Sequence, residues 1–496
     1  MKEPLSPRQI RYRHIVAVVA AIALVGFLNF AFGEIYRIPV PSIHDEFAYL
    51  LMGDTFAHGR LTNPPHPHWE HFETFHVFHR PTYQSKYPPG QGIALAVGQV
   101  LFDLPIAGVW ISLALACGAV CWMLLAFFPA QWSFLGALVV GMNVYIMFEW
   151  GQGYWGGAVA MLGGALLFGG VFRMRKELSF GNTIVMALGT FILSISRPFE
   201  GLVLCAGSGV LVFLAIYHWI RAGETGKLVA VFFLPFTVLC VMGAGWHLYY
   251  NYRLTDDPLT LPYSNYQHRQ NAETTNKTLK KYKGSPTLET RDEIRRVWVF
   301  FFGPILSLSL LGLWRDWKRP ETLLAIALSL LVVALSITGT RAWPHYMAPA
   351  VGLFVYLVMQ GFWSLQTIAI KRFRIGYYLS ILILTVFFVN STYTLYRVVD
   401  KGPMFSRSNV RLKIIRYLLK EDGKDLVFVR YGRKHNVHSE WVYNGADIDN
   451  SEIVWARELS PQRNQHLRKY FTDRRVWLIL ADKNPVRVIA YREAEL

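Results

Sequence analysis

The chain has 496 residues, of which 53% are apolar and only 17% are charged, and its formal net charge is +17 at pH 7. This composition argues against a soluble globular enzyme. The basic excess does not indicate a nucleic-acid partner, because many of the lysines and arginines stand in short links between apolar runs.

Long apolar runs recur, and residues 15–33, 228–246, 342–365 and 375–396 are among those that contain no Asp, Glu, Lys or Arg. A bilayer core of about 30 Å needs about 20 helical residues, so each run can form a transmembrane helix. The sequence therefore predicts an α-helical multi-pass membrane protein.

The short basic links predict the orientation, because cytoplasmic loops are enriched in Lys and Arg. They lie at residues 2–13, 173–176, 221–227, 315–319 and 371–374. The polar stretches that then fall outside are 34–90, 196–201, 251–297, 340–346 and the tail after residue 397. Between residues 90 and 172 there are four apolar segments, near 91–103, 105–128, 132–148 and 154–172. The predicted orientation requires an odd number of crossings there, because residue 90 lies outside and residue 173 inside. We expect 11 to 13 transmembrane helices within residues 1–400.

The C-terminal part has a different character, since no membrane-length apolar run follows residue 400. Helical patterns occur at 408–420 and 461–471, and short strands are predicted at 426–430, 452–456, 476–481 and 486–491. Residues 401–496 are therefore expected to form a small extracytoplasmic α/β domain.

The polar segment 34–90 contains the strongest indication of chemistry. It includes His44-Asp45-Glu46 with Tyr49, and it ends in Lys86-Tyr87-Pro88-Pro89 at the start of the next apolar run. A carboxylate there can accept a proton from an acceptor hydroxyl or amine, while Lys86 and Arg60 hold a lipid phosphate. Alternatively, the acidic pair only begins a helix, where acidic side chains interact favourably with the helix dipole.

These two motifs resemble the first outer loop of the GT-C glycosyltransferases, in particular the protein O-mannosyltransferase and lipid A aminoarabinose transferase group. That group has Asp-Glu, a Tyr three residues later, and Lys-Pro-Pro at the start of the next helix. The turn Arg341-Ala-Trp-Pro-His345-Tyr346-Met-Ala-Pro349 is similar to its late Arg-Tyr-Leu-Leu-Pro turn. The likeness extends to about residue 397. The interposed Tyr87, the preceding His44 and a histidine-rich insert depart from the pattern.

The resemblance implies inverting transfer of a sugar from a polyprenyl-phosphate donor, with no required cofactor. Asp45 matches the catalytic base, and Glu46 stands beside it. The expected donor-phosphate residues are Lys86, Arg341, Tyr346 and Arg60. The expected substrate-cavity residues are Tyr49, Tyr87, Arg197, Glu200 and His345. Arg197 and Glu200 could instead form a structural pair at the membrane interface.

Seven of the 15 histidines lie in this first segment: His44, His58, His66, His68, His71, His76 and His79. Imidazole is a good ligand for zinc and other transition metals, so His66, His68 and His71 are candidate ligands for a divalent metal. Their spacing differs from the helical His-Glu-x-x-His arrangement of metalloproteases. Hydrogen-bonding or pH-sensitive loop histidines are the alternative.

Together these features predict a membrane glycosyltransferase of the cell envelope, located in the bacterial inner (cell) membrane with its active site outside. Its expected partners are a polyprenyl-phosphate sugar donor, a lipid, glycan or protein acceptor, and the lipid bilayer. The main alternative is a transporter or flippase of lipid-linked sugars, which would be expected to bury several charged residues in mid-span. A binding or assembly protein is a third hypothesis.

Overall fold

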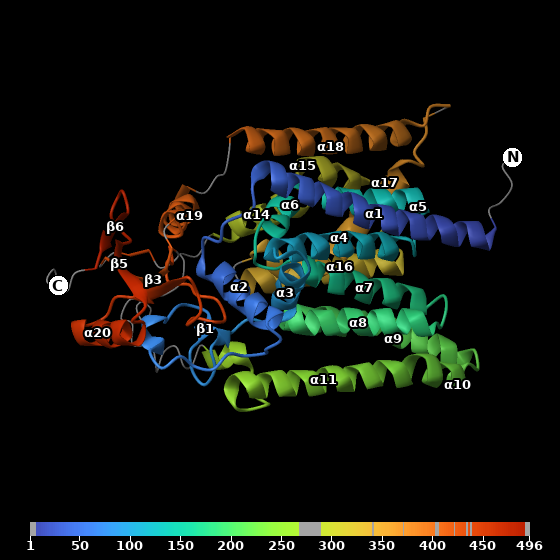
Figure 1. The fold of residues 1–496 in the computed structure, drawn as a ribbon. Helices are drawn as coiled ribbons and strands as arrows, with labels where there is room; N and C mark the ends of the chain where they lie inside the picture. The colour runs from blue at the N-terminus through green and yellow to red at the C-terminus, as the bar shows by residue number, and fades with distance from the viewer. Residues whose placement is uncertain are drawn as a thin grey trace. The chain divides into compact units, whose positions relative to one another are not determined.

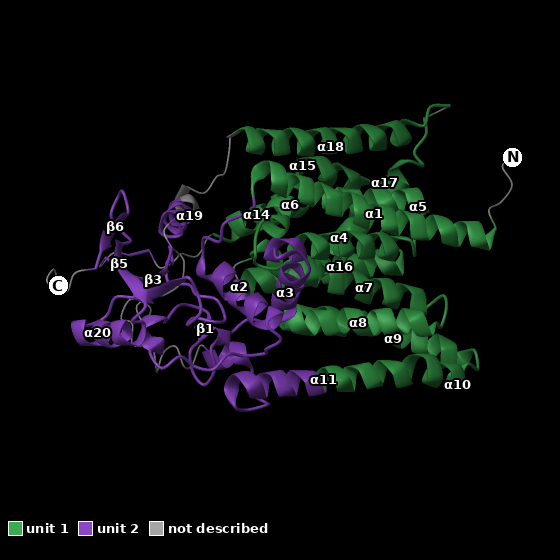
Figure 2. Cartoon of the chain, in the orientation of Figure 1, with its two compact units in different colours: residues 1–37, 109–244, 286–402 green, residues 38–108, 245–285, 403–496 purple. Residues whose placement is uncertain are grey.

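The computed structural model describes residues 6–266, 289–339, 342–370, 372–401, 406–420, 422–432, 435–436 and 439–491. Helices dominate, and the C-terminal part contains a small sheet (Figure 1). The chain divides into two compact units, each built from three stretches of sequence (Figure 2). Unit 1 comprises Met1–Arg37, Val109–Ala244 and Pro286–Gly402, and unit 2 comprises Ile38–Gly108, Gly245–Ser285 and Pro403–Leu496.

Helices form unit 1, although α4 begins and α11 ends in unit 2. In chain order they are α1 (Pro7–Tyr36), α4 (Pro105–Leu124), α5 (Ala130–Gly141), α6 (Val144–Gly151), α7 (Ala158–Met174), α8 (Phe180–Ser196), α9 (Pro198–Arg221), α10 (Thr225–Leu228), the π-helical η2 (Val229–Phe233), α11 (Leu234–Thr255), α14 (Thr290–Phe301), α15 (Gly303–Ser307), η3 (Leu308–Arg315), α16 (Pro320–Gly339), η4 (Pro344–Tyr346), η5 (Ala348–Ala350), α17 (Val351–Leu365) and α18 (Ile375–Lys401).

Several of these helices are long and apolar enough to cross a membrane. Within the described ranges there are seven: α1, α4, α9, the continuous helix Thr225–Thr255, α16, Ala348–Leu365 and α18. Two bent pairs, α5 with α6 and α14 with Gly303–Arg315, raise the number to nine if each pair is one span. Three shorter apolar helices are α3 (Gly90–Phe102), α7 and α8. The multi-pass helical architecture is confirmed, and the expected 11 to 13 spans are reached only when shorter helices are counted as crossings.

Helix α3 is a candidate for an apolar segment between residues 90 and 172 that does not cross the membrane. It has 13 residues, and a helix of that length is about 20 Å long, which is less than the roughly 30 Å bilayer core. Without α3, the remaining segments are α4, the bent α5–α6 pair and α7. Three crossings satisfy the predicted orientation.

Unit 1 is stabilised by close packing of apolar helices around α17. In Ala348–Leu365, 94% of the apolar stretch is buried inside the protein. In Thr225–Thr255 the buried share is 11%, so most of its side chains would face lipid. Small residues permit close contact between α7 and α8, as is common in membrane proteins. A Cβ added to Gly189 of α8 would lie 2.5 Å from the backbone nitrogen of Leu167 in α7.

Unit 2 combines short helices with two small sheets. Its elements are α2 (His44–Ala57), η1 (Trp69–His71), β1 (Val77–Phe78), β2 (Gln84–Ser85), α3, α19 (Ser406–Leu418), β3 (Lys424–Arg430), β4 (Ile453–Arg457), α20 (Pro461–Tyr470), β5 (Arg474–Leu480) and β6 (Arg487–Ala490). The larger sheet has the order β4-β3-β5-β6, in which β3 runs parallel to β4 and β5 while β6 is antiparallel to β5. The small α/β region predicted in the tail is therefore present.

The tail and the first polar segment share one hydrophobic core. Buried side chains of α2 (Ala48, Leu51) and of the following loop (Phe72) belong to the same cluster as Leu426 and Phe428 of β3. Residues almost 400 positions apart in sequence therefore fold together within unit 2. The unit that contains the tail also includes the first segment and residues 245–285.

Candidate functional site

The two adjacent acids at the start of α2 have different environments. Glu46 is buried, and its carboxylate accepts hydrogen bonds from the backbone N–H of Ser42 (2.9 Å) and from the Ser42 hydroxyl (3.3 Å). These contacts fix the chain at the entry to the helix. The Asp45 side chain keeps 28% of its surface exposed. The capping interpretation therefore applies to Glu46, and Asp45 is the acid that can meet a substrate.

Three side chains surround the Asp45 carboxylate. The Tyr87 hydroxyl donates a hydrogen bond to it. The His44 Nδ1 lies 3.0 Å from one carboxylate oxygen, and the His76 Nε2 lies 3.8 Å from the other. Tyr49, one helical turn after Asp45, stacks on Tyr87 with ring centroids 4.6 Å apart. The structure thus brings together Asp45, Tyr49 and Tyr87 from the predicted set and adds His76, to which sequence analysis gave no role.

These neighbours keep Asp45 ionised. Burial raises the pKa of the carboxyl, but the hydrogen bond from His44, the charges of His76 and His44, and the Tyr87 hydroxyl outweigh burial and hold the pKa well below its usual value. Burial and the negative charge of Asp45 raise the pKa of Tyr87. Tyr87 therefore keeps its proton and remains a hydrogen-bond donor to Asp45.

Lys86 lies inside a cage of tyrosine rings. Its side chain is 6% exposed. Its Nζ lies 4.4 Å from the ring centroid of Tyr263, 4.8 Å from Tyr266 and 5.3 Å from Tyr87. Burial lowers the pKa of Lys86 to about 8, although the charge of Asp45 acts in the opposite direction. Within the described part of the chain the ammonium makes no hydrogen bond or ion pair. It is a buried cation whose N–H donors remain available.

Tyr263 and Tyr266 come from a distant segment, residues 262–266, and sequence analysis did not single them out. The ring of Tyr266 covers Lys86. The Tyr266 hydroxyl accepts a hydrogen bond from the backbone N–H of His76 (2.7 Å). Its ring packs in a buried cluster with Phe78 and Tyr250. The available signal was a pair of tyrosines three residues apart in a predicted outer loop, although that pattern alone did not identify a lysine partner.

Of the predicted metal ligands His66, His68 and His71, the imidazoles of His66 and His71 make other polar contacts, and the ring of His68 lies beside Tyr470. His66 Nε2 lies 3.1 Å from a carboxylate oxygen of Asp449 in the tail. The two ring nitrogens of His71 lie 2.8 and 3.3 Å from the carbonyl oxygens of Arg457 and Arg463, and burial lowers the pKa of His71. These geometries favour the hydrogen-bonding alternative, in which the histidines attach the first segment to the tail.

A different trio could hold a metal ion. In the portion that the structure describes, the single group of three ligating residues with ligand atoms within 4.8 Å of one another is His44, Asp45 and His76. Two imidazoles and a carboxylate match the ligands that zinc prefers.

Arg60 contributes to the electrostatic field of the tail. Hydrogen bonds from Asn450 are the largest cause of a lowered pKa at Asp447, and the charge of Arg60 adds to the effect. Among the described residues, no contact of Arg60 tests its predicted role at the donor phosphate.

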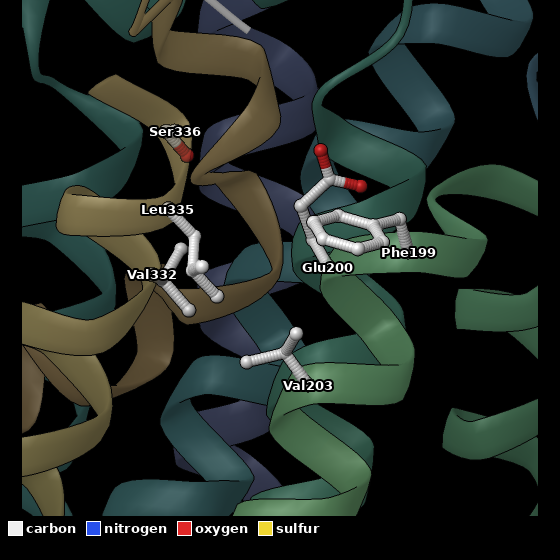
Figure 3. Close-up of a pocket in the computed structure, with 6 residues that line it drawn as sticks. All are labelled: Phe199, Glu200, Val203, Val332, Leu335 and Ser336. Carbon is white, nitrogen blue, oxygen red and sulfur yellow. The ribbon is translucent and has the colours of Figure 1, made fainter. Parts of the chain in front are cut away.

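The remaining predicted residues lie in unit 1. The guanidinium of Arg197 lies 4.8 Å from the ring centroid of Tyr346, and that ring is 4.5 Å from His345. Glu200 is buried and lines a small pocket between α9 and α16 (Figure 3). The other residues that line it are Phe199, Val203, Val332, Leu335 and Ser336. Arg341 lies outside the described residues.

Comparisons with known proteins define the class of the fold. No protein-family model and no curated protein sequence matches the chain. Solved structures do match, and they show that the chain has the GT-C fold of membrane glycosyltransferases.

One match over nearly the full length is to ArnT, a lipid A aminoarabinose transferase, from Cupriavidus metallidurans bound to undecaprenyl phosphate. The identity is 12%, the TM-score is 0.55, and the alignment covers 94% of this chain and 92% of ArnT. The oligosaccharyltransferase of Archaeoglobus fulgidus tethered to an acceptor peptide matches at 10% identity with a TM-score of 0.46, covering 95% of this chain and 69% of that one. At such low identity the likeness concerns the fold.

Proposed function

We propose that the chain is a GT-C glycosyltransferase that moves a sugar from a polyprenyl-phosphate donor to an acceptor outside the cytoplasm. Asp45 acts as the general base, and Lys86 binds the donor phosphate. The proposal includes inversion at the anomeric carbon. It also includes location in the bacterial inner membrane, with Asp45 and the tail on the extracytoplasmic face, and an acceptor that is a lipid, a glycan or a protein.

The single observation that most supports the proposal is the unpaired ammonium of Lys86 beside an ionised carboxylate. Leaving a buried cation without a partner is costly, so an anion is the expected ligand. Lys86 and Asp45 stand in the motif by which the sequence resembles a glycosyltransferase group. ArnT, which shares the fold across nearly the whole chain, binds undecaprenyl phosphate. A lipid-linked phosphate therefore suits the site in charge and chemistry.

The reaction is a single displacement in which the acceptor oxygen or nitrogen forms a bond to the anomeric carbon. The bond from that carbon to the phosphate oxygen breaks, and its electron pair stays with the phosphate. The acceptor proton passes to the carboxylate of Asp45, since the attacking group becomes acidic as its new bond forms. The ammonium of Lys86 stabilises the charge that gathers on the leaving phosphate. Attack opposite the leaving group inverts the anomeric centre.

Tyr87 and the two histidines position Asp45 in this scheme. The Tyr87 hydroxyl fixes the orientation of the carboxylate through a hydrogen bond, and the His44 Nδ1, 3.0 Å from the other carboxylate oxygen, holds it from the second side. If the enzyme binds a divalent cation, His44, Asp45 and His76 are the residues that would hold it, and the ion would supply positive charge beside the donor phosphate. The unit 1 residues Tyr346, His345, Arg197 and Glu200 are proposed as further substrate contacts, together with Arg341.

A transfer assay with purified protein and a polyprenyl-phosphate sugar tests the roles of Asp45 and Lys86. Asp45→Asn should reduce kcat about 10²–10⁴-fold, the range that a general base contributes, while donor binding persists. Lys86→Met should instead weaken donor binding. The matched control is Glu46→Gln, which alters the neighbouring acid and should retain most activity, because Glu46 contacts Ser42. Near-normal turnover of Asp45→Asn protein would sink the assignment. Transport of a lipid-linked sugar without transfer would favour the alternative of a flippase.

Sidedness needs a separate measurement. A cysteine introduced at Lys469, an exposed position of α20, should react in intact cells with a membrane-impermeant thiol reagent. Cys117 and Cys121 are buried, and a protein without the introduced cysteine controls for reaction at Cys205 and Cys240. Labelling only after permeabilisation would place the tail in the cytoplasm.

A further inference from the structure

Among the described residues in the C-terminal part of unit 2, three arginines are almost completely buried, and one of them differs from the others. Arg411 is 8% exposed, Arg457 5% and Arg474 6%. Arg457 forms an ion pair with Glu440 at 2.6 Å. Arg474 donates to several backbone carbonyls, including that of Asp449 at 2.6 Å. In the described ranges Arg411 makes no hydrogen bond or ion pair, and its buried Nε has no partner.

Aromatic rings surround the Arg411 guanidinium. Its central carbon lies 4.8 Å from the ring centroid of Trp455, 5.0 Å from Phe47 and 5.9 Å from Tyr443. Burial lowers the pKa of Arg411 to about 10, so the group stays charged at neutral pH. Cation–π contacts offset only part of the cost of removing such a charge from water. The side chains that the structure describes around Arg411 provide no ion-pair partner for it.

The acidic side chain that acts electrostatically on Arg411 is already paired elsewhere. Glu440 acts on Arg411 through its charge, but its carboxylate is already bound by Arg457 and by the Tyr431 hydroxyl. The helix that contains Arg411 adds positive charge, because α19 has Lys413 and Arg416 and no acidic residue. The field around Arg411 is therefore favourable to an anion from outside the chain.

The Arg411 site lies apart from the Asp45 site. Phe47 follows Asp45 by two positions in α2, and two positions correspond to about 200° around a helix. The side chains consequently point to opposite faces. On one face Asp45 meets Tyr87 and His76. On the other, Phe47 stacks on Tyr443 with centroids 4.7 Å apart and covers Arg411.

We propose that Arg411, with Phe47, Tyr443 and Trp455, forms a binding site for a phosphate group on the face of α2 opposite Asp45. The planar guanidinium has terminal nitrogens that can donate two parallel hydrogen bonds to phosphate oxygens, and aromatic rings beside it can cover an attached sugar or lipid head group. If the proposed transferase function is correct, the phosphate belongs to the acceptor. That last assignment rests on the proposed function, but the binding site itself does not.

Thermal unfolding of the full-length protein in detergent tests the site without a transfer assay. All proteins contain Lys86→Met, so that binding at the donor site does not contribute. The probes are inorganic phosphate, a short-chain phosphatidic acid, and the matching diacylglycerol as an uncharged control. We expect a saturable rise in Tm with phosphatidic acid and none with diacylglycerol. A rise with inorganic phosphate as well would show that the phosphate group alone is recognised. A rise with the lipid alone would identify a lipid head group as the source.

Variants separate a ligand site from a structural contact. Arg411→Met should abolish the rise in Tm, whereas Arg416→Met, an exposed position on the same helix, should preserve it. Arg411→Lys keeps the charge but loses the two parallel hydrogen-bond donors of the guanidinium, and should weaken the apparent phosphate affinity about tenfold. Without any probe, Arg411→Met should have a Tm equal to or above that of the parent, because an unpaired buried charge is removed. A lower Tm, an unchanged response of Arg411→Met protein, or no response of the parent to either phosphate probe would overturn the proposal.

Discussion

Unit 1 and unit 2 are built from different interactions. In unit 1, apolar helices approach closely through small residues, as at Gly189 and Gly164, and α17 is enclosed by its neighbours. In unit 2, three distant segments are joined by polar contacts, such as the hydrogen bonds from Thr74 to Glu440 and from the His76 backbone to Tyr266, as well as by a shared apolar core. The proposed catalytic groups lie in unit 2. Its chemistry should therefore respond to changes far away in the sequence, whereas changes inside unit 1 should act on the helical bundle.

The largest expected effect comes from breaking the buried ion pair of unit 2. Arg457→Met leaves the carboxylate of Glu440 buried and unpaired and should cost about 3–5 kcal/mol of unfolding free energy. Because Arg457 also donates to the carbonyl oxygen of Glu73 in the first segment, hydrogen exchange should accelerate in α2 as well as in β3. Arg175→Met is the control, since both partners of its pair with Glu321 are partly exposed (38% and 28%), and it should cost less than about 1 kcal/mol. Acceleration confined to the tail would show that the two segments are not one cooperative unit.

A helix contact in unit 1 should give a smaller loss. A methyl group at Gly189 would approach the Leu167 backbone to 2.5 Å, so Gly189→Ala should destabilise the protein by about 1–3 kcal/mol through overpacking. Gly209→Ala in α9 is the matched control, because nothing lies within 4 Å of an added Cβ there. Unfolding in a denaturing detergent measures both, and equal stability of the two variants would contradict the packing account.

The pH dependence of transfer should follow Lys86. Its pKa is lowered to about 8, so the fraction of free protein with a charged ammonium falls as the pH rises through that value. The expected result is a loss of kcat/KM above pH 8 that approaches about tenfold per pH unit, with no matching loss below it. Lys86→Arg should shift this alkaline limb to higher pH, because arginine stays protonated. An unchanged limb in Lys86→Arg protein would assign the titration to another group.

The smallest effect is expected at the Tyr266 hydroxyl. Tyr266→Phe removes one hydrogen bond to the His76 backbone but keeps the ring over Lys86, and it should lower kcat/KM about fivefold, the equivalent of about 1 kcal/mol. The alkaline limb should stay in place, because the cage is intact. Tyr417→Phe, on an exposed side chain of α19, should leave the rate unchanged. A loss of 100-fold or more in Tyr266→Phe protein would mean that the hydroxyl itself contacts substrate.

The membrane helices and the motif residues could be predicted from sequence because their signals are local. Apolar runs gave the spans of unit 1, and the order of Asp45 and Lys86 indicated the candidate site. The cage could not be predicted, since Tyr263 and Tyr266 reach Lys86 from almost 180 residues away. The polar partners of the histidines could not be predicted for the same reason. The partners of His66 and His71 lie in the tail, and no local spacing reveals a carboxylate or carbonyl nearly 400 residues distant.

The core shared by α2 and β3 has a consequence for biosynthesis. Leu51 emerges from the ribosome long before Leu426, with which it shares a buried cluster. At a synthesis rate of about 5–20 residues per second, the first segment waits roughly 20–80 s for the strands that complete its core. During that interval its apolar side chains have no native partner from the tail. A truncated product that lacks the tail could complete its helices and still never assemble the Asp45 site.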